Sequence, residues 1–296
     1  MTNKRALITG INGFTGKYVS EELENAGYTV YGIGTVVADF PRYFQVDLLD
    51  KQGLEDVVRE VQPTVVAHLA AIAFVGHGVA DDFYHVNLIG TRNLLEALAL
   101  NAKGLEAVLL ASSANVYGNS FEGVLTEGTL PNPANDYAVS KLAMEYMAKL
   151  WLDKLPLFIV RPFNYTGIGQ SEDFLLPKIV SHFRRKALYI ELGNIDVWRD
   201  FSDVRSVAKI YRRLIEVKPI GQTVNVCSGR THSLREVLAI AENISAHKME
   251  VRVNPAFVRA NEVKSLCGDV TLLHSLIGER ELLSLEQTLR CMLMAE

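Results

Sequence analysis

Ala6-Leu7-Ile8-Thr9-Gly10-Ile11-Asn12-Gly13-Phe14-Thr15-Gly16 is the stretch that decides the fold. Its first four residues predict a short buried strand, and residues 17–26 have the pattern of an amphipathic helix. Glycine recurs at every third position between them, which permits a tight turn and lets backbone N–H groups and the helix N-terminus approach a pyrophosphate. The stretch therefore predicts a dinucleotide-binding turn, with a plain turn as the alternative. Its candidate cofactor-binding residues are Gly10, Asn12, Gly13, Phe14, Thr15 and Gly16.

Strands and helices alternate from this turn to about residue 165. We expect strands at 29–34, 44–48, 64–71, 107–111 and 157–161, and helices at 53–61, at 81–101 and from 137 onwards. Such alternation requires crossover connections, and hence a parallel sheet with helices on both faces. The predicted class is α/β, with a Rossmann-type doubly wound parallel sheet.

The last part of the chain mixes short strands and helices, and we expect it to form a smaller α/β C-terminal lobe over the substrate. Helices are expected at 207–216, 233–246, 272–277 and 285–293, and strands at 223–226 and 249–253. We predict that residues 1–165 and 196–218 form the dinucleotide-binding domain. Residues 166–195 and 219–296 are predicted to form the nucleotide-sugar-binding lobe.

The composition excludes several classes of protein. The chain has 296 residues, of which 49% are hydrophobic and 22% are charged, as is usual for a globular enzyme. A net charge of -4 and a sequence pI near 6.0 argue against a nucleic-acid partner, and no apolar run is long enough to cross a membrane. The start of the chain lacks the features of a signal peptide. Because the three cysteines are scattered, we expect a cytoplasmic protein with reduced thiols and no metal site.

A candidate acid/base pair lies in the segment Asn-Asp-Tyr-Ala-Val-Ser-Lys at residues 135–141. Tyr137 and Lys141 are four residues apart, so their side chains share one face of a helix. An ammonium group favours the phenolate, which predicts a pKa for Tyr137 below the usual value of about 10. Ser112 and Ser113 end a central strand, where ligands bind in open α/β sheets. The alternative for the pair is a packed tyrosine beside a solvated lysine.

The end of the second strand carries the signal for the choice of cofactor. Enzymes that use NAD place an acidic residue there to hold the ribose 2′-OH, but this chain has Gly34 and Thr35. Without a carboxylate to repel a 2′-phosphate, NADP(H) is favoured over NAD(H). Asp47 is a candidate contact to the adenine, with an acidic loop residue of no function as the alternative. His68 is expected to be a packed core residue. The other candidates for the cofactor site are Thr35, Leu48, Leu69, Ala70, Ala71, Arg161 and Asn87, the last of which we also expect to bond to the neighbouring strand.

Four motifs follow one another along the chain: Gly10-x-x-Gly13-x-x-Gly16, Ser112-Ser113-Ala114-Asn115-Val116-Tyr117-Gly118, Tyr137-x-x-x-Lys141 and Arg161-Pro162-Phe163-Asn164. Together they resemble the extended short-chain dehydrogenases/reductases that act on nucleotide sugars, and the resemblance covers nearly the whole chain. It implies that Tyr137 is the acid/base, and that Lys141 binds the nicotinamide ribose and tunes the phenol. It also implies that Ser113 hydrogen-bonds the sugar and that Asn164 contacts the substrate.

Two segments of the second half are similar to the GDP-mannose 4,6-dehydratases and their reductase relatives. Residues 192–201 read Leu-Gly-Asn-Ile-Asp-Val-Trp-Arg-Asp-Phe, and residues 259–263 read Arg-Ala-Asn-Glu-Val where the family has Arg-Pro-Thr-Glu-Val. The similarity implies that Arg199 and Arg259 clamp the diphosphate and that Glu262 accepts hydrogen bonds from the nucleotide ribose. Guanidinium groups suit phosphate oxygens, and the alternative for each arginine is a surface salt bridge. Lys178 is a further candidate substrate ligand.

One departure from the family concerns the residues after the catalytic serine. Where the dehydratases carry acidic residues, this chain has Ala114 and Asn115, neither of which is a general base. The resemblance thus implies loss of dehydration, with Asn115 orienting a sugar hydroxyl. The predicted reaction is hydride transfer from NAD(P)H to the C4 keto group of a GDP-4-keto-6-deoxy-hexose, giving a GDP-6-deoxy-hexose of the GDP-D-rhamnose type.

Two alternatives to this reaction stay open at the level of sequence. One is a nucleotide-sugar 4-epimerase that keeps NAD tightly bound and uses the same serine, tyrosine and lysine. The other is a non-catalytic dinucleotide-binding sensor or scaffold. By similarity we also expect a homodimer, in which the helices at 81–101 and 137–152 pack as a four-helix bundle with their copies in the partner.

Overall fold

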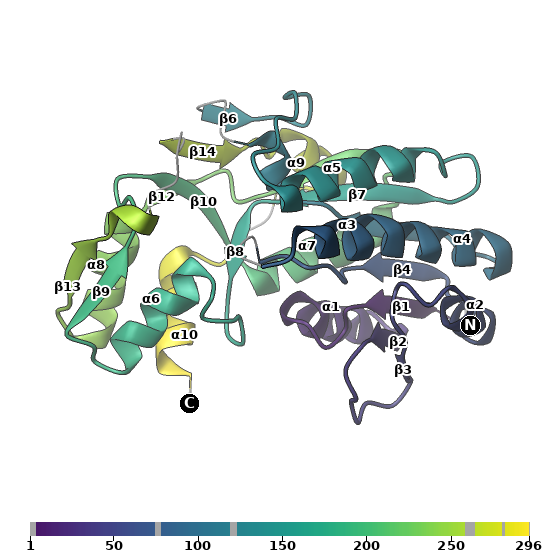
Figure 1. The fold of residues 1–296 in the computed structure, drawn as a ribbon, viewed down its shortest axis with the longest axis horizontal. Coiled ribbons are helices and arrows are strands. Elements are labelled where there is room, and N and C mark those ends of the chain that lie inside the picture. The colour runs from purple at the N-terminus through teal and green to yellow at the C-terminus, as the bar shows by residue number, and fades with distance from the viewer. Residues whose placement is uncertain (1–3, 75–77, 119–122, 258–263, 280–281, 296) are drawn as a thin grey trace.

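A seven-stranded parallel sheet forms the centre of the molecule (Figure 1). The structure is a computed structural model that describes residues 4–74, 78–118, 123–257, 264–279 and 282–295. The strands run in the order β3-β2-β1-β4-β5-β7-β11, and each pairs in parallel with its neighbours. They are β1 (Arg5–Thr9), β2 (Thr29–Gly34), β3 (Tyr43–Gln45), β4 (Val65–His68), β5 (Ala107–Ala111), β7 (Leu157–Pro162) and β11 (Thr223–Val226).

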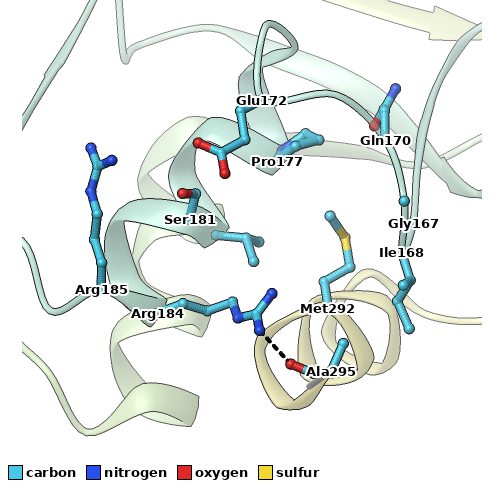
Figure 2. A pocket seen from close by; sticks show the side chains of 12 residues that line it. Gly167, Ile168, Gln170, Glu172, Pro177, Ser181, Arg184, Arg185, Met292 and Ala295 are labelled. Carbon is cyan, nitrogen blue, oxygen red and sulfur yellow. Dashed lines mark hydrogen bonds between the residues drawn. The ribbon is translucent and has the colours of Figure 1, made fainter.

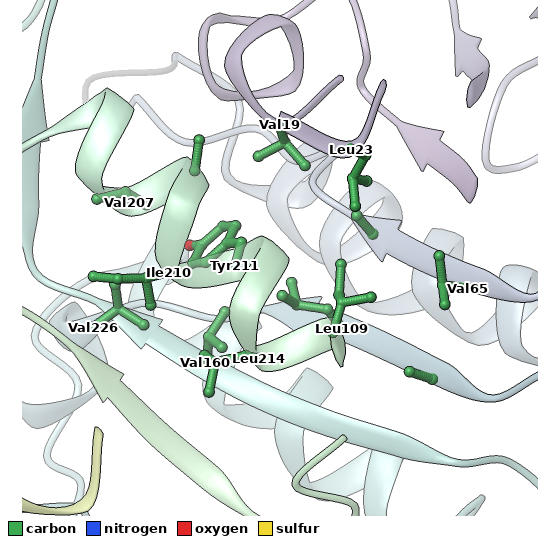
Figure 3. Close-up of a cluster of buried hydrophobic side chains, with 14 of the residues drawn as sticks. Val19, Leu23, Val65, Leu109, Val160, Val207, Ile210, Tyr211, Leu214 and Val226 are labelled. Carbon is green, nitrogen blue, oxygen red and sulfur yellow. The ribbon is translucent and has the colours of Figure 1, made fainter. Parts of the chain in front are cut away.

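Helices cover both faces of this sheet, which is why its central strands are apolar on both sides. One face carries α1 (Phe14–Asn25), α7 (Val204–Val217) and α9 (Thr271–Ile277). Figure 3 shows the core on this face, where Val19 and Leu23 of α1 and Tyr211 of α7 pack over strand residues such as Leu109. The other face carries α2 (Lys51–Val61), α4 (Thr91–Asn101) and α5 (Asp136–Lys149).

The direction of strand addition reverses between β1 and β4. From β1 the chain adds β2 and β3 on one side, and it then adds β4, β5 and β7 on the other. Connections therefore diverge at the carboxyl ends of β1 and β4, and this is the point at which open α/β sheets bind ligands. The turn at residues 10–16 follows β1, and residues 69–71 follow β4.

The segment that we expected as one helix over 81–101 consists of three pieces. α3 (Ala80–Tyr84) leads into a π-helical segment, η1 (His85–Gly90), and α4 follows. Within η1, the side-chain amide of Asn87 bonds to the backbone of Ile72, and the hydroxyl of Thr91 donates to the carbonyl oxygen of Asn87 at 2.7 Å. These side-chain bonds to the backbone favour a local departure from α-helical winding.

A smaller lobe holds a mixed sheet and its own core. β10 (Trp198–Asp203) pairs in parallel with β8 (Asn164–Thr166) and β14 (Ser265–Gly268), and antiparallel with β12 (Thr231–Ser233). Helices α6 (Leu175–Arg184), α8 (Leu234–Ser245) and α10 (Leu285–Met294) enclose the core of this lobe. The remaining elements are η2 (Ala114–Tyr117), β6 (Gly123–Leu125), β9 (Tyr189–Leu192), β13 (Glu250–Val253) and η3 (Pro255–Phe257).

This architecture confirms the predicted α/β class, with a Rossmann-type sheet and a smaller C-terminal lobe. Two strands belong to a different sheet from the one that their predicted domain implies. β11 is an edge strand of the main sheet, where Val224 and Val226 are buried beside β7, and β10 belongs to the sheet of the lobe. The division of the chain into two domains otherwise stays a prediction. Among the residues described, no helix is both long and apolar enough to traverse a bilayer.

Candidate active site

The glycine turn leaves the N-terminus of α1 open to a ligand. Gly10 has a φ of +71°, and a Cβ at this position would lie 2.9 Å from the backbone of Ala70. A Cβ on Gly16 would lie 2.2 Å from the carbonyl oxygen of Gly10. Gly13 is exposed and precedes α1 without any side-chain cap. The turn therefore fits the close approach of a pyrophosphate to backbone N–H groups.

The other predicted residues of the turn face two different neighbours. The side-chain nitrogen of Asn12 lies beside the end of β2, 3.4 Å from where a Cβ on Gly34 would be. The hydroxyl of Thr15 hydrogen-bonds with that of Tyr165 at 2.8 Å, and the ring of Phe14 stacks on Tyr165 with centroids 6.0 Å apart. Tyr165 on β8 thus ties the start of α1 to the smaller lobe.

Ser113, Tyr137 and Lys141 meet at the carboxyl end of β5. The side chain of Asn135 accepts a hydrogen bond from the N–H of Ala138 at 2.9 Å, which starts α5 and places Tyr137 in its first turn. The Ser113 hydroxyl hydrogen-bonds with Tyr137. The Nζ atom of Lys141 donates to the carbonyl oxygen of Ala111 at 2.8 Å. The three side chains are buried, and their arrangement provides a proton donor, a neighbouring hydroxyl and an amine within one site.

Burial dominates the protonation of this group. Removal from water raises the pKa of Tyr137 to about 12, although the Ser113 hydroxyl acts in the opposite direction. Removal from water also lowers the pKa of Lys141 to about 8. The expectation of a lowered phenol pKa is therefore wrong for this structure, because desolvation opposes the phenolate and Lys141 points to a backbone carbonyl.

His68 is a core residue, as the sequence predicts. Its ring bonds to the hydroxyls of Thr9 and Thr91 at 2.7 and 2.8 Å. Burial, followed by the charge of Lys141, lowers its pKa to about 3, so the imidazole is neutral at pH 7. It therefore supports the ends of β1 and β4 beneath the site rather than taking part in proton transfer.

Arg161, which the sequence placed in the cofactor site, belongs to a buried ion pair. Its guanidinium donates to both carboxylate oxygens of Glu145, at 2.9 Å from Nε and 2.6 Å from Nη2. It also donates to the Tyr117 hydroxyl at 3.0 Å. These contacts give the guanidinium hydrogen-bond partners within the protein. The geometry of Arg161 therefore gives no support to the prediction that it contacts the cofactor directly. Glu145 itself was missed, although its spacing of four from Lys141 places it on the same helical face.

The remaining cofactor candidates surround the ends of β2 and β4. Thr35 and Asp47 are exposed, and a carboxylate oxygen of Asp47 accepts from the N–H of Leu49 at 2.8 Å. The backbone N–H groups of Leu69 and Ala70 both donate to the Thr9 hydroxyl at 3.2 Å. Among the other candidates, the side chain of Leu48 is buried, Ala71 is half-buried, and Asn87 bonds to Ile72 and Ser140 as a structural residue.

The substrate candidates that the structure describes lie on both lobes. Asn115 and Asn164 are exposed, and the amide of Asn164 donates to the carbonyl oxygen of Asp200 at 3.3 Å. Arg199 donates to the carbonyl oxygen of Trp198 at 2.8 Å. Lys178 donates to the carbonyl oxygen of Glu191 at 3.0 Å and lies over the ring of Phe257. Arg259 and Glu262 lie outside the described residues.

A cavity of about 440 Å³ lies between α6, the chain after β8 and the end of α10 (Figure 2). Glu172 and Arg184 project from opposite sides of it, and Arg184 donates to the carbonyl oxygen of Ala295 at 2.6 Å. Neither the group of Ser113, Tyr137 and Lys141 nor the glycine turn lines this cavity. The cavity is therefore separate from the candidate active site. No cluster of three potential metal-ligating side chains occurs in the part of the chain that the structure describes.

Comparison with known families and proteins shows which proteins the chain is similar to. The family described as GDP-mannose 4,6 dehydratase matches residues 7–292. A GDP-6-deoxy-D-talose 4-dehydrogenase from Aggregatibacter actinomycetemcomitans is 36% identical, over 93% of this chain and 91% of its own length. A GDP-6-deoxy-D-mannose reductase from Pseudomonas aeruginosa is 34% identical, over 98% of this chain and 96% of its own length.

Two solved structures share both the fold and a substantial part of the sequence. A Burkholderia cenocepacia J2315 protein that has been suggested to be an epimerase is 51% identical, with a TM-score of 0.93 over 99% of this chain and 97% of its own. The Pseudomonas aeruginosa protein RMD in complex with NADPH is 31% identical, with a TM-score of 0.85 over 98% of each chain.

Proposed function

The chain belongs to the GDP-mannose 4,6-dehydratase family, and from this membership we propose that it is a reductase of GDP-4-keto-6-deoxy-hexoses. It is an NAD(P)-dependent nucleotide-sugar-modifying enzyme of the extended short-chain dehydrogenase/reductase type, so the non-catalytic alternative is not carried forward. The proposed product is a GDP-6-deoxy-hexose of the D-rhamnose type. The observation that carries the proposal is the buried group of Ser113, Tyr137 and Lys141, together with the lack of a carboxylate at the two positions directly after Ser113.

In the proposed reaction, each side chain of this group has one task. A reduced nicotinamide bound at the glycine turn would supply the hydride for C4 of the sugar. Tyr137 donates a proton to the C4 oxygen, and its raised pKa of about 12 keeps the phenol protonated at neutral pH. Ser113 donates a hydrogen bond to the same oxygen and polarises the carbonyl. Lys141, whose pKa is about 8, stays largely charged at pH 7 and holds the nicotinamide ribose.

The two residues that directly follow Ser113 support reduction without elimination of water. Ala114 and Asn115 occupy the positions after the serine, and neither side chain removes a proton. The buried carboxylate of Glu145 is engaged by Arg161 and by the hydroxyl of Ser112. Asn115 is exposed at the site, where its amide would orient a sugar hydroxyl.

NADPH is the proposed reductant, because β2 ends without an acidic residue. Gly34 and the exposed Thr35 carry no negative charge against a 2′-phosphate, whereas a carboxylate there would repel it. Asn12 beside Gly34 and the exposed Asp47 are the proposed contacts on the adenosine side. RMD, a relative with 31% identity, binds NADPH, which supports the same preference here.

The nucleotide part of the substrate is proposed to lie along the smaller lobe. Arg199 and Arg259 would hold the diphosphate, and Glu262 would accept hydrogen bonds from the ribose hydroxyls. Asn164 and Lys178 would contact the substrate from β8 and α6. The GDP specificity is supported by the two curated relatives, whose names both give a GDP-linked 6-deoxy-hexose.

The proposal is tested by supplying a GDP-4-keto-6-deoxy-hexose with NADPH or NADH and identifying the product by NMR. We expect a GDP-6-deoxy-hexose and faster turnover with NADPH. A panel of GDP, UDP, dTDP and CDP in thermal unfolding checks the base independently, because only a bound nucleotide raises the unfolding temperature. The absence of any reduced product with either cofactor would reject the proposed function.

A 4-epimerase is the second candidate, and the 51% identity to the suggested Burkholderia epimerase favours it. A retained NAD would then accept the hydride from C4 and later return it, while Tyr137, with Ser113 and Lys141 beside it, would take up and give back the proton of the C4 hydroxyl. Purified protein that carries one NAD per chain and interconverts two GDP-hexoses without added NADPH would support this alternative over the reductase.

We further propose a homodimer through α4 and α5. Large apolar side chains are exposed along these helices, including Leu100 on α4 and Val139 and Tyr146 on α5, as expected of helix faces that pack against a partner. The mass of one chain is 32.8 kDa. Light scattering during size-exclusion chromatography is expected to give twice this mass. Monomeric protein at micromolar concentration contradicts this proposal.

A further inference from the structure

Three consecutive residues at the end of β5, numbers 111–113, each form a hydrogen bond with a different turn of α5. The carbonyl oxygen of Ala111 accepts from Lys141 at 2.8 Å. The hydroxyl of Ser112 donates to Oε1 of Glu145 at 2.5 Å, and the hydroxyl of Ser113 hydrogen-bonds with Tyr137. The outer two of these contacts involve the reacting groups, whereas the contact between Ser112 and Glu145 involves neither substrate nor cofactor.

Glu145 is therefore the link between the catalytic helix and the catalytic strand. It lies four residues after Lys141, on the same helical face, and the residue is 1% exposed. Arg161 on β7 holds both of its oxygens, at 2.9 and 2.6 Å. A bidentate pair of this kind fixes orientation as well as distance.

Arg161 is in turn held from the opposite side. Its Nη1 atom donates to the hydroxyl of Tyr117 at 3.0 Å, and the guanidinium lies 4.9 Å from the centre of the same ring. The hydroxyl of Tyr117 donates to Oδ1 of Asn225 on β11 at 2.7 Å. The buried polar chain thus runs from α5 across β5 and β7 to β11, and each charged member has its partners.

We propose that Glu145, clamped by Arg161, is a positioning residue that sets the distance from Ser113 to Tyr137 and keeps a negative charge one helical turn from Lys141. This role rests on the proposed function of Tyr137 and Lys141. The charge has a measurable consequence, because Glu145 raises the pKa of Lys141 against the larger effect of burial. His68, which faces Lys141 from β4, is neutral at pH 7 and does not substitute for this carboxylate.

The test uses a variant that removes both charges together, because a single substitution of Glu145 leaves Arg161 unpaired. Glu145→Gln removes the carboxylate and leaves the buried guanidinium of Arg161 without a counter-charge. Variants of this kind often fold poorly. The double variant Glu145→Met/Arg161→Met removes the pair together and retains buried volume. Glu286→Met/Arg290→Met is the matched control, because these residues form an exposed pair on α10 at 2.9 Å, far from the acid/base group in sequence and fold.

The first readout is NADPH affinity against pH, measured by protein fluorescence. In the native chain we expect affinity to decrease as pH rises through about 8, where Lys141 loses its proton. In the folded double variant this decrease is expected at a pH lower by on the order of one unit, and it should be missing in Lys141→Met. The matched control is expected to follow the native curve.

The second readout is turnover of the keto sugar. A displaced serine or tyrosine is expected to reduce kcat of the double variant by about 10- to 100-fold, because the reacting groups are no longer aligned. KM for the sugar is expected to change by less than about threefold, because the displacement affects alignment rather than binding. A folded double variant with the native pH curve and native kcat overturns the proposal, as does a native affinity that is constant with pH. If the native chain and the double variant show the two expected pH curves but the native chain reduces no keto sugar, the proposed function fails, while the effect of the Glu145 charge on Lys141 stands.

Discussion

Tyr137→Phe removes one hydroxyl from the proposed proton donor and leaves its ring in place. The ring packs 6.0 Å from that of Phe83, and the residue is 7% exposed, so phenylalanine fills the same space. The hydrogen bond to Ser113 is lost, but the Ser113 hydroxyl still accepts from the N–H of Asn115 at 3.1 Å. The free energy of unfolding should therefore change by about 1 kcal/mol at most, the net value of one hydrogen bond.

The expected effect of Tyr137→Phe on catalysis is much larger. Loss of a general acid reduces turnover by about 10²- to 10⁴-fold, which corresponds to roughly 3–5 kcal/mol of activation free energy. The assay follows the loss of NADPH absorbance at saturating keto sugar, with urea unfolding of the same sample to confirm the fold. NADPH affinity is expected to change little, because the phenol acts on the sugar oxygen.

Tyr84→Phe is the matched control for this substitution. Tyr84 is also in the segment beside α5, but its hydroxyl donates to the carboxylate of Asp136 at the surface, at 2.7 Å. We expect its turnover to stay within twofold of native, since a surface hydrogen bond to the helix start contributes little to the site. If Tyr137→Phe kept more than a tenth of native turnover in folded protein, the assignment of the proton donor would be refuted.

Three other perturbations test the structure around the site. Gly16→Ala places a methyl group 2.2 Å from the carbonyl oxygen of Gly10, so we expect about 1–3 kcal/mol of destabilisation in urea and weaker NADPH binding, whereas Gly128→Ala meets only ordinary contacts and should be neutral in both assays. Tyr211→Phe removes a buried hydroxyl that has no hydrogen-bond partner among the described residues; its thermal unfolding midpoint should be unchanged or higher, and a clear decrease contradicts the packing described. His68 has its pKa lowered from 6.5 to about 3, so the unfolded chain binds a proton that the folded chain does not, and stability should decline as pH falls from 6.5 towards 3 by up to roughly 4–5 kcal/mol; an equal decline in His68→Gln argues against this residue as the cause.

The main sheet is predictable because its signals are local. The strand at residues 5–9 ends in a glycine that needs a positive φ, and the strands that follow it are short apolar runs separated by helices of clear periodicity. The capped helix expected at residue 233 begins there, since Ser233 and Glu236 form the two bonds of a capping box. β11 was assigned to the other lobe because an edge strand and a lobe strand have the same local pattern.

That Tyr137 and Lys141 share a helical face was predictable from spacing, but their electrostatics were not. The separation of Tyr137 and Lys141 reveals that they share a helical face, whereas the depth of burial that raises the pKa of the phenol depends on the complete fold. The ion pair of Arg161 was not predictable for the same reason: its partner Glu145 is 16 residues away in sequence, and only the packing of α5 on β7 brings the two together. The contact of Tyr165 with Thr15 spans 150 residues, beyond any pattern read from the chain.

The most direct test of the reductase assignment is the fate of a deuterium carried on the transferable position of NADPH. If the enzyme reduces the keto sugar as proposed, NMR of the product will show one deuterium at C4 of each hexose formed, in proportion to the NADPH consumed. A product that carries no deuterium at C4, formed without loss of NADPH, would contradict the account and identify a retained cofactor as the source of hydride.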